Sequence, residues 1–194
     1  MGELAGGFEP LDVSPSGRST TVKAHLRPAR ADDVEACAVL SAQVSDIQHA
    51  DRMQILGRDV DMTDRLLVVA VQGQLVIGYG RAGRFEPPED APDNVAPAGY
   101  YLMGLVVDRA HRRQGFGAAL TTYRLEWLAG RTNQAWYFAD VRNPVSVALH
   151  ESVGFRTVTT DFWFPGFVEG DEQHVLCRLD LRDRHDARID QHPQ

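Results

Sequence analysis

Residues 102–120 read LMGLVVDRAHRRQGFGAAL, and this stretch decides the fold. The segment 100–107 is apolar at nearly every position, which predicts a central strand buried on both faces. After it, apolar side chains recur at the spacing of one helix face and stop before Gly130, a residue type that commonly ends helices; they are Phe116, Leu120, Tyr123 and Trp127. A buried strand is therefore expected to lead into an amphipathic helix through a short turn.

That turn, RRQGFG at 112–117, has the composition of an anion-binding site. Gly115 and Gly117 let backbone N–H groups approach a ligand closely, and the start of a helix adds positive potential. Arg112 and Arg113 supply donors suited to phosphate oxygens. The alternative is an ordinary strand-to-helix turn whose arginines are solvated.

A second glycine pattern, GYGRAG at 78–83, matches the dinucleotide-binding spacing G-x-G-x-x-G. That fingerprint must open a helix whose N-terminus receives a pyrophosphate. Here RFEPP follows at 84–88 and cannot form a helix interior. We therefore expect no nucleotide site at these glycines.

The remaining patterns predict strands and helices in a mixed order. Before the central strand we expect a strand at 22–26, helices around 34–44 and 47–56, a hairpin of 66–71 with 75–79 around a three-residue loop, and a surface loop at 87–97. After the long helix we expect a strand at 135–141, a short helix at 145–152, and strands at 155–164 and 174–181. This order predicts an α/β (α+β) fold in which helices flank a mixed sheet.

Length and composition favour one domain. The chain has 194 residues, of which 43% are apolar, enough for one sizeable core. Residues 1–20 are rich in Gly, Ser and Pro and are expected to form a disordered arm, while 183–194 are almost entirely polar and are expected to leave the core as a tail. The domain itself is expected to span 21–182.

Composition also argues against several function classes. The formal charge of -7 disfavours nucleic-acid binding. No run of about 18 apolar residues and no secretory leader is present, so we expect a cytoplasmic protein away from membranes. Cys37 and Cys177 lie far apart without metal-ligand spacing, which disfavours a disulfide framework or a metal site.

Two ordered motifs carry a family resemblance. The stretch 102–120 resembles the acetyl-CoA motif of the GNAT acetyltransferases, Q/R-x-x-G-x-G/A, with Arg112, Gly115 and Gly117 at the marked positions. Residues 143–155, NPVSVALHESVGF, are similar to the family segment N-x-x-(A/S)-x-x-L-(Y/H)-E-x-x-G-F, and 26–40 are similar to the family's first strand and helix. The resemblance spans roughly 22–181 and implies a GNAT fold, with about seven strands in a mixed central sheet and about four flanking helices.

The resemblance implies acetyl-CoA as the acyl donor. The central strand would splay from its neighbour and pair with the pantetheine arm along Leu105, Val106 and Val107, where an amide of Leu105 or Val106 would hold the thioester carbonyl. The pyrophosphate would rest beside Arg112 on the backbone amides of Arg113, Gln114, Gly115, Phe116, Gly117 and Ala118. Asn143 and Ser146 would contact the pantetheine, although Asn143 before a proline also fits a helix entry.

The resemblance also suggests a proton donor. His150 stands where many relatives have a tyrosine thought to protonate the CoA thiolate, and relatives resembling phosphinothricin acetyltransferases have histidine there. An imidazole titrates near neutral pH and could do this, whereas the alternative is a structural histidine on a helix face. No carboxylate lies in 100–107, so the amine proton would leave through water or to Glu86, Asp140 or Tyr137.

The implied function is an N-acetyltransferase that moves acetyl from acetyl-CoA to a primary amine by direct attack in a ternary complex, without a metal. A longer acyl-CoA or a non-catalytic CoA-binding sensor are the alternatives. The acceptor would enter over the first two helices and the loop after the next-to-last strand, where 162–167 read FWFPGF and the acids Glu169, Asp171 and Glu172 follow. This aromatic wall could bind a cationic amine, aided by an acidic rim of Glu86, Glu89, Asp90 and Asp93, or could form a homodimer contact.

Overall fold

The computed structural model describes residues 11–13, 24–45, 47–166 and 173–182. The chain forms two compact units, each built from two stretches: unit 1 is Met1–Arg81 with Gly104–Trp127, and unit 2 is Ala82–Met103 with Leu128–Gln194. The described residues hold four α-helices and a mixed sheet of eight strands, one more strand than expected. The predicted fold class is therefore confirmed.

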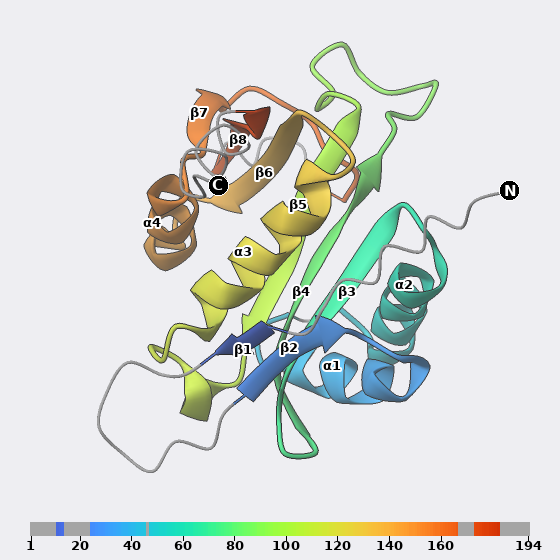
Figure 1. The fold of residues 1–194 in the computed structure, drawn as a ribbon. Coiled ribbons are helices and arrows are strands. Elements are labelled where there is room, and N and C mark those ends of the chain that lie inside the picture. Colours follow the sequence, from blue (N-terminus) through green and yellow to red (C-terminus); the bar gives the residue numbers. More distant parts are fainter. Residues whose placement is uncertain (1–10, 14–23, 46, 167–172, 183–194) are drawn as a thin grey trace, which may run out of the picture. The chain divides into compact units, whose positions relative to one another are not determined.

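Unit 1 packs two helices against antiparallel strands. Strand β3 (Arg65–Gln72) pairs with β2 (Ala24–Pro28), which pairs in turn with β1 (Leu11–Val13). Helices α1 (Val34–Ser41) and α2 (His49–Asp61) lie side by side next to β2 and β3 (Figure 1). Every residue from Leu66 to Val71 is buried, as expected for a run of Leu and β-branched side chains in a central strand. The core of this unit gathers Val34, Cys37, Leu56, Val69, Tyr79 and Val106.

Some boundaries in unit 1 differ from the sequence expectations. Strand β1 lies inside the arm expected to be disordered, because its three residues find backbone partners on β2. Helix α2 runs from His49 to Asp61, beyond the expected end at residue 56. The hairpin between β3 and β4 (Leu75–Phe85) has a two-residue turn, not three, and Gly73 adopts φ +63° in it. The rest of the 1–20 arm and the 183–194 tail lie outside the described residues.

The glycines at 78–83 lie in β4, which continues to Phe85, beyond the expected end at residue 79, and two of them have packing roles in unit 1. A Cβ on Gly78 would lie 2.9 Å from the carbonyl oxygen of Val106 on β5 (Gly99–Val107). A Cβ on Gly80 would lie 2.9 Å from Nε of Arg124 on α3 (Phe116–Ala129). These glycines are needed for close packing and form no nucleotide-binding turn.

The two halves of β5 differ in burial. In unit 2, Tyr101 and Leu102 are buried, and the parallel register of β5 with β6 (Gln134–Asp140) runs from Tyr100 to Leu102. In unit 1, Gly104 is exposed, and Leu105 and Val107 are only half-buried. The prediction of burial on both faces is therefore wrong for the second half, where the strand carries apolar residues that its own chain does not fully cover.

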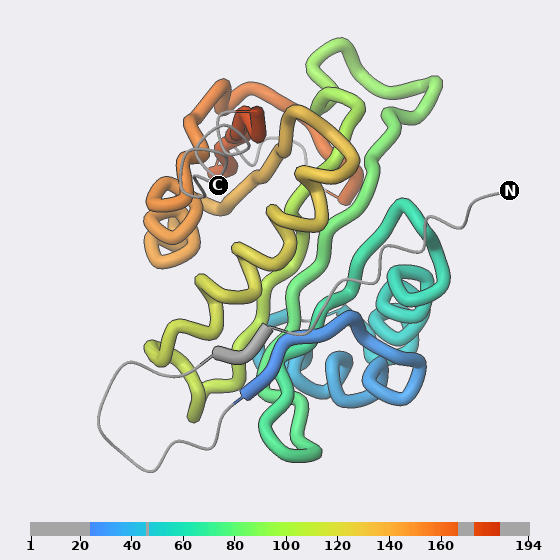
Figure 2. Tube along the Cα trace, in the orientation of Figure 1, coloured from blue at the N-terminus to red at the C-terminus, as the bar shows by residue number. Residues whose placement is uncertain are grey.

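Unit 2 continues the sheet in the order β5-β6-β8-β7. The chain leaves β6, passes through α4 (Pro144–Ser152), and returns through β7 (Arg156–Thr159); β8 (His174–Asp180) pairs antiparallel with β6 and with β7 (Figure 2). The predicted strand at 155–164 is too long, because the β7 register shifts between Thr157 and Thr159 and the chain then turns away. The core of this unit gathers Phe85, Ala96, Tyr101, Trp136, Phe162 and Leu176.

In the described ranges, no helix combines the length and apolarity needed to cross a membrane. The same part of the chain contains no group of three or more His, Cys, Asp or Glu side chains that could hold a metal ion. Cys37 and Cys177 are buried free thiols, and burial raises the pKa of both, for Cys37 to about 12. These thiols are packing residues in their two cores.

Candidate active site

The turn before α3 points a set of backbone donors outward. The first helical hydrogen bond runs from the Ala119 N–H to the Gly115 carbonyl at 3.0 Å, so the N–H groups of Phe116, Gly117 and Ala118 have no acceptor in the helix. Arg113 and Gly115 adopt positive φ angles of 61° and 87°, in the left-handed region. Positive φ at alternate residues turns successive backbone N–H groups to one side. A Cβ on Gly115 would meet no heavy atom within 4 Å, so the space in front of it is open.

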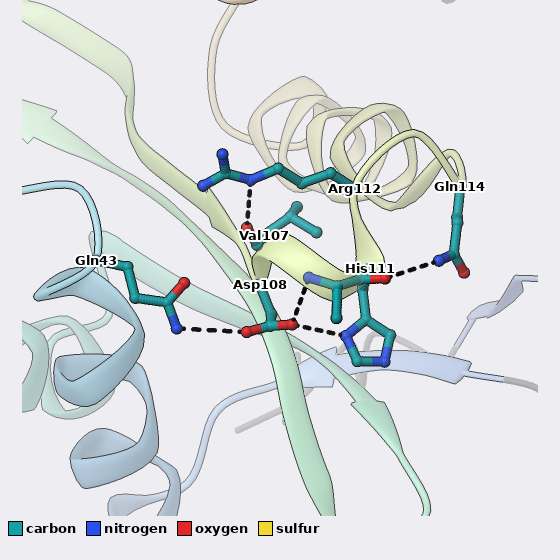
Figure 3. Close-up of polar contacts among 7 residues, drawn as sticks. Gln43, Val107, Asp108, His111, Arg112 and Gln114 are labelled. Atoms are coloured by element: carbon teal, nitrogen blue, oxygen red, sulfur yellow. Dashed lines mark hydrogen bonds and ion pairs between the residues drawn. The ribbon is translucent and has the colours of Figure 1, made fainter.

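Asp108 sets the shape of the chain entering this turn (Figure 3). Its Oδ1 accepts from the Ala110 N–H at 2.9 Å and faces His111 Nδ1 at 3.0 Å, while Oδ2 accepts from Gln43 Nε2 at 3.3 Å. The hydrogen bonds from His111 and Gln43 lower the pKa of Asp108. Asp108 is therefore held by donors of its own unit and fixes the chain that enters the turn.

Two side chains of the predicted motif fold back onto the backbone. Arg112 Nε donates to the Val107 carbonyl at 3.1 Å, and Gln114 Nε2 donates to the Ala110 carbonyl at 3.2 Å (Figure 3). Arg112 thus ties the turn to the end of β5, and its terminal nitrogens have no hydrogen-bond partner among the described residues. Arg112 and Arg113 are both exposed, so the mouth of the turn is cationic.

A buried arginine that the sequence reading missed supports the start of α3. Arg124 is fully buried; it donates to the Leu120 and Arg81 carbonyls at 3.2 Å and to Thr121 Oγ1 at 2.9 Å. Thr121 Oγ1 in turn donates to the Gly117 carbonyl at 2.9 Å. The signal was present, because Arg124 follows Leu120 by four residues and so lies beside the apolar stripe of the helix.

In unit 2, the second motif forms the start of α4. Asn143 precedes the helix and its Oδ1 accepts from the Ser146 N–H at 3.2 Å, which confirms the expected cap, with Pro144 in the first turn. The Ser146 hydroxyl lies 2.7 Å from the phenolic oxygen of Tyr137 on β6. Asn143, Ser146 and Tyr137 therefore form one polar group at this helix end.

His150 lies behind that group. The residue is only 2% exposed. Its ring stacks on that of Tyr137, with the ring centroids 3.6 Å apart and an interplanar angle of 11°. Nδ1 lies 2.8 Å from the Ser146 carbonyl oxygen, so Nδ1 carries the proton and donates. The histidine thus holds the tyrosine ring and the helix turn that bear the two hydroxyls.

The carboxylates considered as general bases are engaged locally. Arg142 donates to both oxygens of Asp140 through its side chain and to one through its backbone N–H, and these bonds lower the pKa of Asp140 to about 2. Glu86 accepts from Arg84 at 2.5 Å. A carboxylate with so low a pKa is a weak base near neutral pH.

The predicted aromatic wall is wrong for one of its described members. Phe162 is buried, and Phe164 packs against Phe85 with ring centroids 4.4 Å apart. Phe162 belongs to the core of unit 2, and half-buried Phe164 packs against that core. Trp163 is also half-buried, and its backbone is bridged to Val95. Phe167, Glu169, Asp171 and Glu172 lie outside the described residues. The rim residues Glu86, Glu89, Asp90 and Asp93 include an internally paired acid, Glu86.

The predicted site residues thus fall into two groups. Leu105, Val106 and Val107 come together in unit 1 with the turn at 112–118, joined by the bond from Arg112 to Val107. Asn143, Ser146 and His150 come together in unit 2 around Tyr137. One group offers backbone donors for an anion and the other a pair of hydroxyls.

Solved structures of acetyltransferases have the same fold. A ribosomal-protein-alanine N-acetyltransferase from Brucella melitensis matches with a TM-score of 0.62 and 20% identity over 80% of this chain and 98% of its own. The yncA protein of Salmonella typhimurium, solved with its cofactor acetyl-CoA, matches with a TM-score of 0.61 and 16% identity over 80% and 92%. An aminoglycoside 6'-N-acetyltransferase from Acinetobacter haemolyticus matches with 0.57 and 18% over 74% and 99%.

Sequence comparison gives the family directly. No curated protein sequence is similar enough to this chain to be matched. The model of the acetyltransferase (GNAT) family matches residues 34–155, more than half of the chain, and this range contains both the turn before α3 and the start of α4. The protein is therefore an acetyltransferase and belongs to the GNAT family.

Proposed function

We propose that this enzyme transfers the acetyl group of acetyl-CoA to a primary amine by direct attack in a ternary complex. The turn at 112–118 carries the proposal. It presents the N–H groups of Phe116, Gly117 and Ala118, open space at Gly115, and two exposed arginines, a donor set that fits a pyrophosphate. An acidic or filled turn would not fit that group.

The second half of β5 supports the same assignment. Gly104 is exposed and Leu105 and Val107 are half-buried, so this stretch of strand has uncovered surface. An amide-containing arm can add to such a strand through backbone hydrogen bonds. We assign this role to Leu105, Val106 and Val107, with an N–H of Leu105 or Val106 directed at the thioester carbonyl oxygen, where negative charge develops during attack.

The reaction requires two proton movements. The amine nitrogen attacks the carbonyl carbon, a C–N bond forms and the C–S bond breaks, so the amine loses one proton and the thiolate sulfur gains one. The thiol has a reference pKa of about 8.5, within the reach of a hydroxyl donor. We assign the proton for the thiolate to the Tyr137–Ser146 hydroxyl pair, with His150 as a positioning residue behind it, because these hydroxyls lie 2.7 Å apart at the head of α4.

The amine proton is assigned to solvent water. Asp140 is held by Arg142 with a pKa of about 2, and Glu86 is held by Arg84. A carboxylate with the low pKa of Asp140 is a poor acceptor for this proton near neutral pH. The rate should therefore rise with pH as the free amine becomes more abundant.

The test is the release of free CoA thiol from acetyl-CoA with a panel of primary amines. Steady release that depends on the amine supports the enzyme. Tight acetyl-CoA binding without release, with every amine, would favour the sensor. Faster release from propionyl- or butyryl-CoA than from acetyl-CoA would favour the longer acyl donor.

A further inference from the structure

A buried arginine on α2 has a hydrogen-bond donor for which the described part of the chain supplies no acceptor. Arg52 is 9% exposed, and its Nη2 donates to Ser45 Oγ at 3.0 Å. Its Nε is buried and has no hydrogen-bond partner among the described residues. A buried donor on a charged group that lacks an acceptor is destabilising, so a native protein that retains one usually pairs it with something else.

No carboxylate of the described residues pairs with Arg52. The buried carboxylate on the same helix, Asp59, accepts from Arg81 Nε and lies 3.5 Å from Arg65 Nη1. Two guanidinium groups therefore already share it. Asp59 is thus engaged by Arg65 and Arg81 and does not pair with Arg52.

The arginine is close to a polar group on the neighbouring strand. The hydroxyl of buried Tyr79 on β4 hydrogen-bonds Ser41; burial raises the pKa of Tyr79, and the positive charges of Arg52 and Arg81 pull the other way. Ser41 is itself buried at the end of α1. The guanidinium thus contacts the Ser45 hydroxyl and interacts electrostatically with the Tyr79 hydroxyl, which is bonded to Ser41.

The same side of β4 reaches the predicted reacting centre. A Cβ on Gly104 would lie 3.6 Å from Arg81 Cδ, so Gly104 keeps open the space next to Arg81. Gly104 directly precedes Leu105, which the proposed function places at the thioester carbonyl. Tyr79 and Arg81 alternate along β4 and so lie on one face of the strand, which links the surroundings of Arg52 to the space next to Gly104.

We propose that the acceptor is a primary amine that also carries a carboxylate, as in an amino acid, and that the unpaired Nε of Arg52 binds this carboxylate with Ser45. The inference rests on the proposed acetyl transfer. A guanidinium edge matches a carboxylate in geometry and charge, and it binds more strongly where water is excluded. A polyamine or other purely cationic acceptor would meet repulsion from Arg52.

The test compares matched acceptors in the CoA-release assay, each amino acid beside its carboxamide. The carboxamide has the more reactive free amine at neutral pH, so a preference for the acid must come from recognition. We expect kcat/KM to favour the acid in the wild type. In Arg52→Gln that preference should fall about 30-fold or more, through KM for the acid, with KM for acetyl-CoA unchanged. Arg52→Lys should show a preference for the acid between those of the wild type and Arg52→Gln, because lysine keeps the positive charge but lacks the planar set of N–H donors.

Arg58→Gln is the matched control, since Arg58 lies on the same helix and is exposed. A melting curve separates binding from folding: because Nε is unsatisfied, Arg52→Met should leave the melting temperature unchanged or raised, whereas a structural arginine would lower it. A wild-type enzyme that prefers carboxamides or polyamines, or an acid preference retained in Arg52→Gln, would overturn the proposal while leaving acetyl transfer in place.

Binding provides the independent readout. Calorimetry of an amino acid and of its N-acetyl derivative, with CoA present, should show Arg52-dependent affinity even in an assay without turnover. Such binding without any CoA release would contradict the proposed acetyl transfer but support the carboxylate site. An amino-acid affinity that is unchanged in Arg52→Gln would contradict the proposed carboxylate site.

Discussion

The turn before α3 and the buried side of α2 both present hydrogen-bond donors in unit 1, yet they are built in different ways. At the turn, the donors are backbone N–H groups, and the site requires that residue 115 have no side chain, as in Gly115. On α2, the donor is a guanidinium nitrogen whose surroundings come from α1, α2 and β4. A backbone site can be read as a short motif, whereas a side-chain site exists only after distant segments have packed.

The largest expected effect tests whether the turn is a backbone site. Gly115→Asp places bulk and negative charge in the open space and should weaken acetyl-CoA binding at least 100-fold, or about 2.8 kcal/mol, in a calorimetric titration. Gly73→Asp is the matched control, because Gly73 also has positive φ and open space, and it should bind as the wild type. Similar affinity in both variants would break the comparison.

The next effect tests how far packing supports the turn. Gly80→Ala brings a Cβ to 2.9 Å from Arg124 Nε, and the fully buried guanidinium must move from Thr121 and the Arg81 carbonyl. We expect a loss of about 1–3 kcal/mol in the free energy of unfolding, measured by urea denaturation. Gly57→Ala, in α2 with open space, should gain about 0.5–1 kcal/mol. A neutral Gly80→Ala would show that Arg124 is not tightly held.

A third experiment extends the comparison to the hydroxyl pair of unit 2. Tyr137→Phe removes the hydroxyl bonded to Ser146 but keeps the ring that stacks on His150. If this hydroxyl protonates the thiolate, kcat should fall about tenfold or more while KM for acetyl-CoA changes little. Tyr101→Phe, which loses a hydroxyl bonded to the Pro97 carbonyl, is the control and should keep kcat. An unchanged kcat in Tyr137→Phe would return the role to His150 or to water.

The smallest effect concerns the hydrogen bond that joins the end of α1 to the residue before the turn. Gln43 follows α1 and donates to Asp108, the residue that shapes the turn. Gln43→Ala should weaken acetyl-CoA binding about two- to fivefold, the usual worth of one hydrogen bond. A fivefold effect on acceptor KM with none on acetyl-CoA would place Gln43 in the acceptor region alone.

The Asp108 carboxylate adds a pH dependence with a definite sign. Its pKa is lowered from 3.8 by His111 and Gln43, so its stabilising bonds are complete above about pH 4 and are lost as pH falls through the lowered value. The unfolding free energy should therefore decline below pH 4, and Asp108→Asn should flatten that decline. An equally steep decline in the variant would contradict this account.

The sequence by itself determined the parts of the protein that depend on local rules. The strand and helix around residues 102–120, the cap at Asn143, and the exclusion of a nucleotide turn at 78–83 all followed from spacing and from the conformational demands of Gly and Pro. The family resemblance, carried by two motifs of this kind, was confirmed by the match over 34–155.

Only the tertiary structure decided which side chains are buried and which residues they contact. Phe162 resembles part of a surface wall in sequence but packs into a core, and Arg52 and Arg124 resemble surface charges but are buried. A helical stripe of Arg52, Leu56 and Asp59 hinted at burial, yet their partners come from other elements. Local patterns fix backbone geometry, because it depends on neighbouring residues, while burial and pairing depend on segments that meet only when the chain folds.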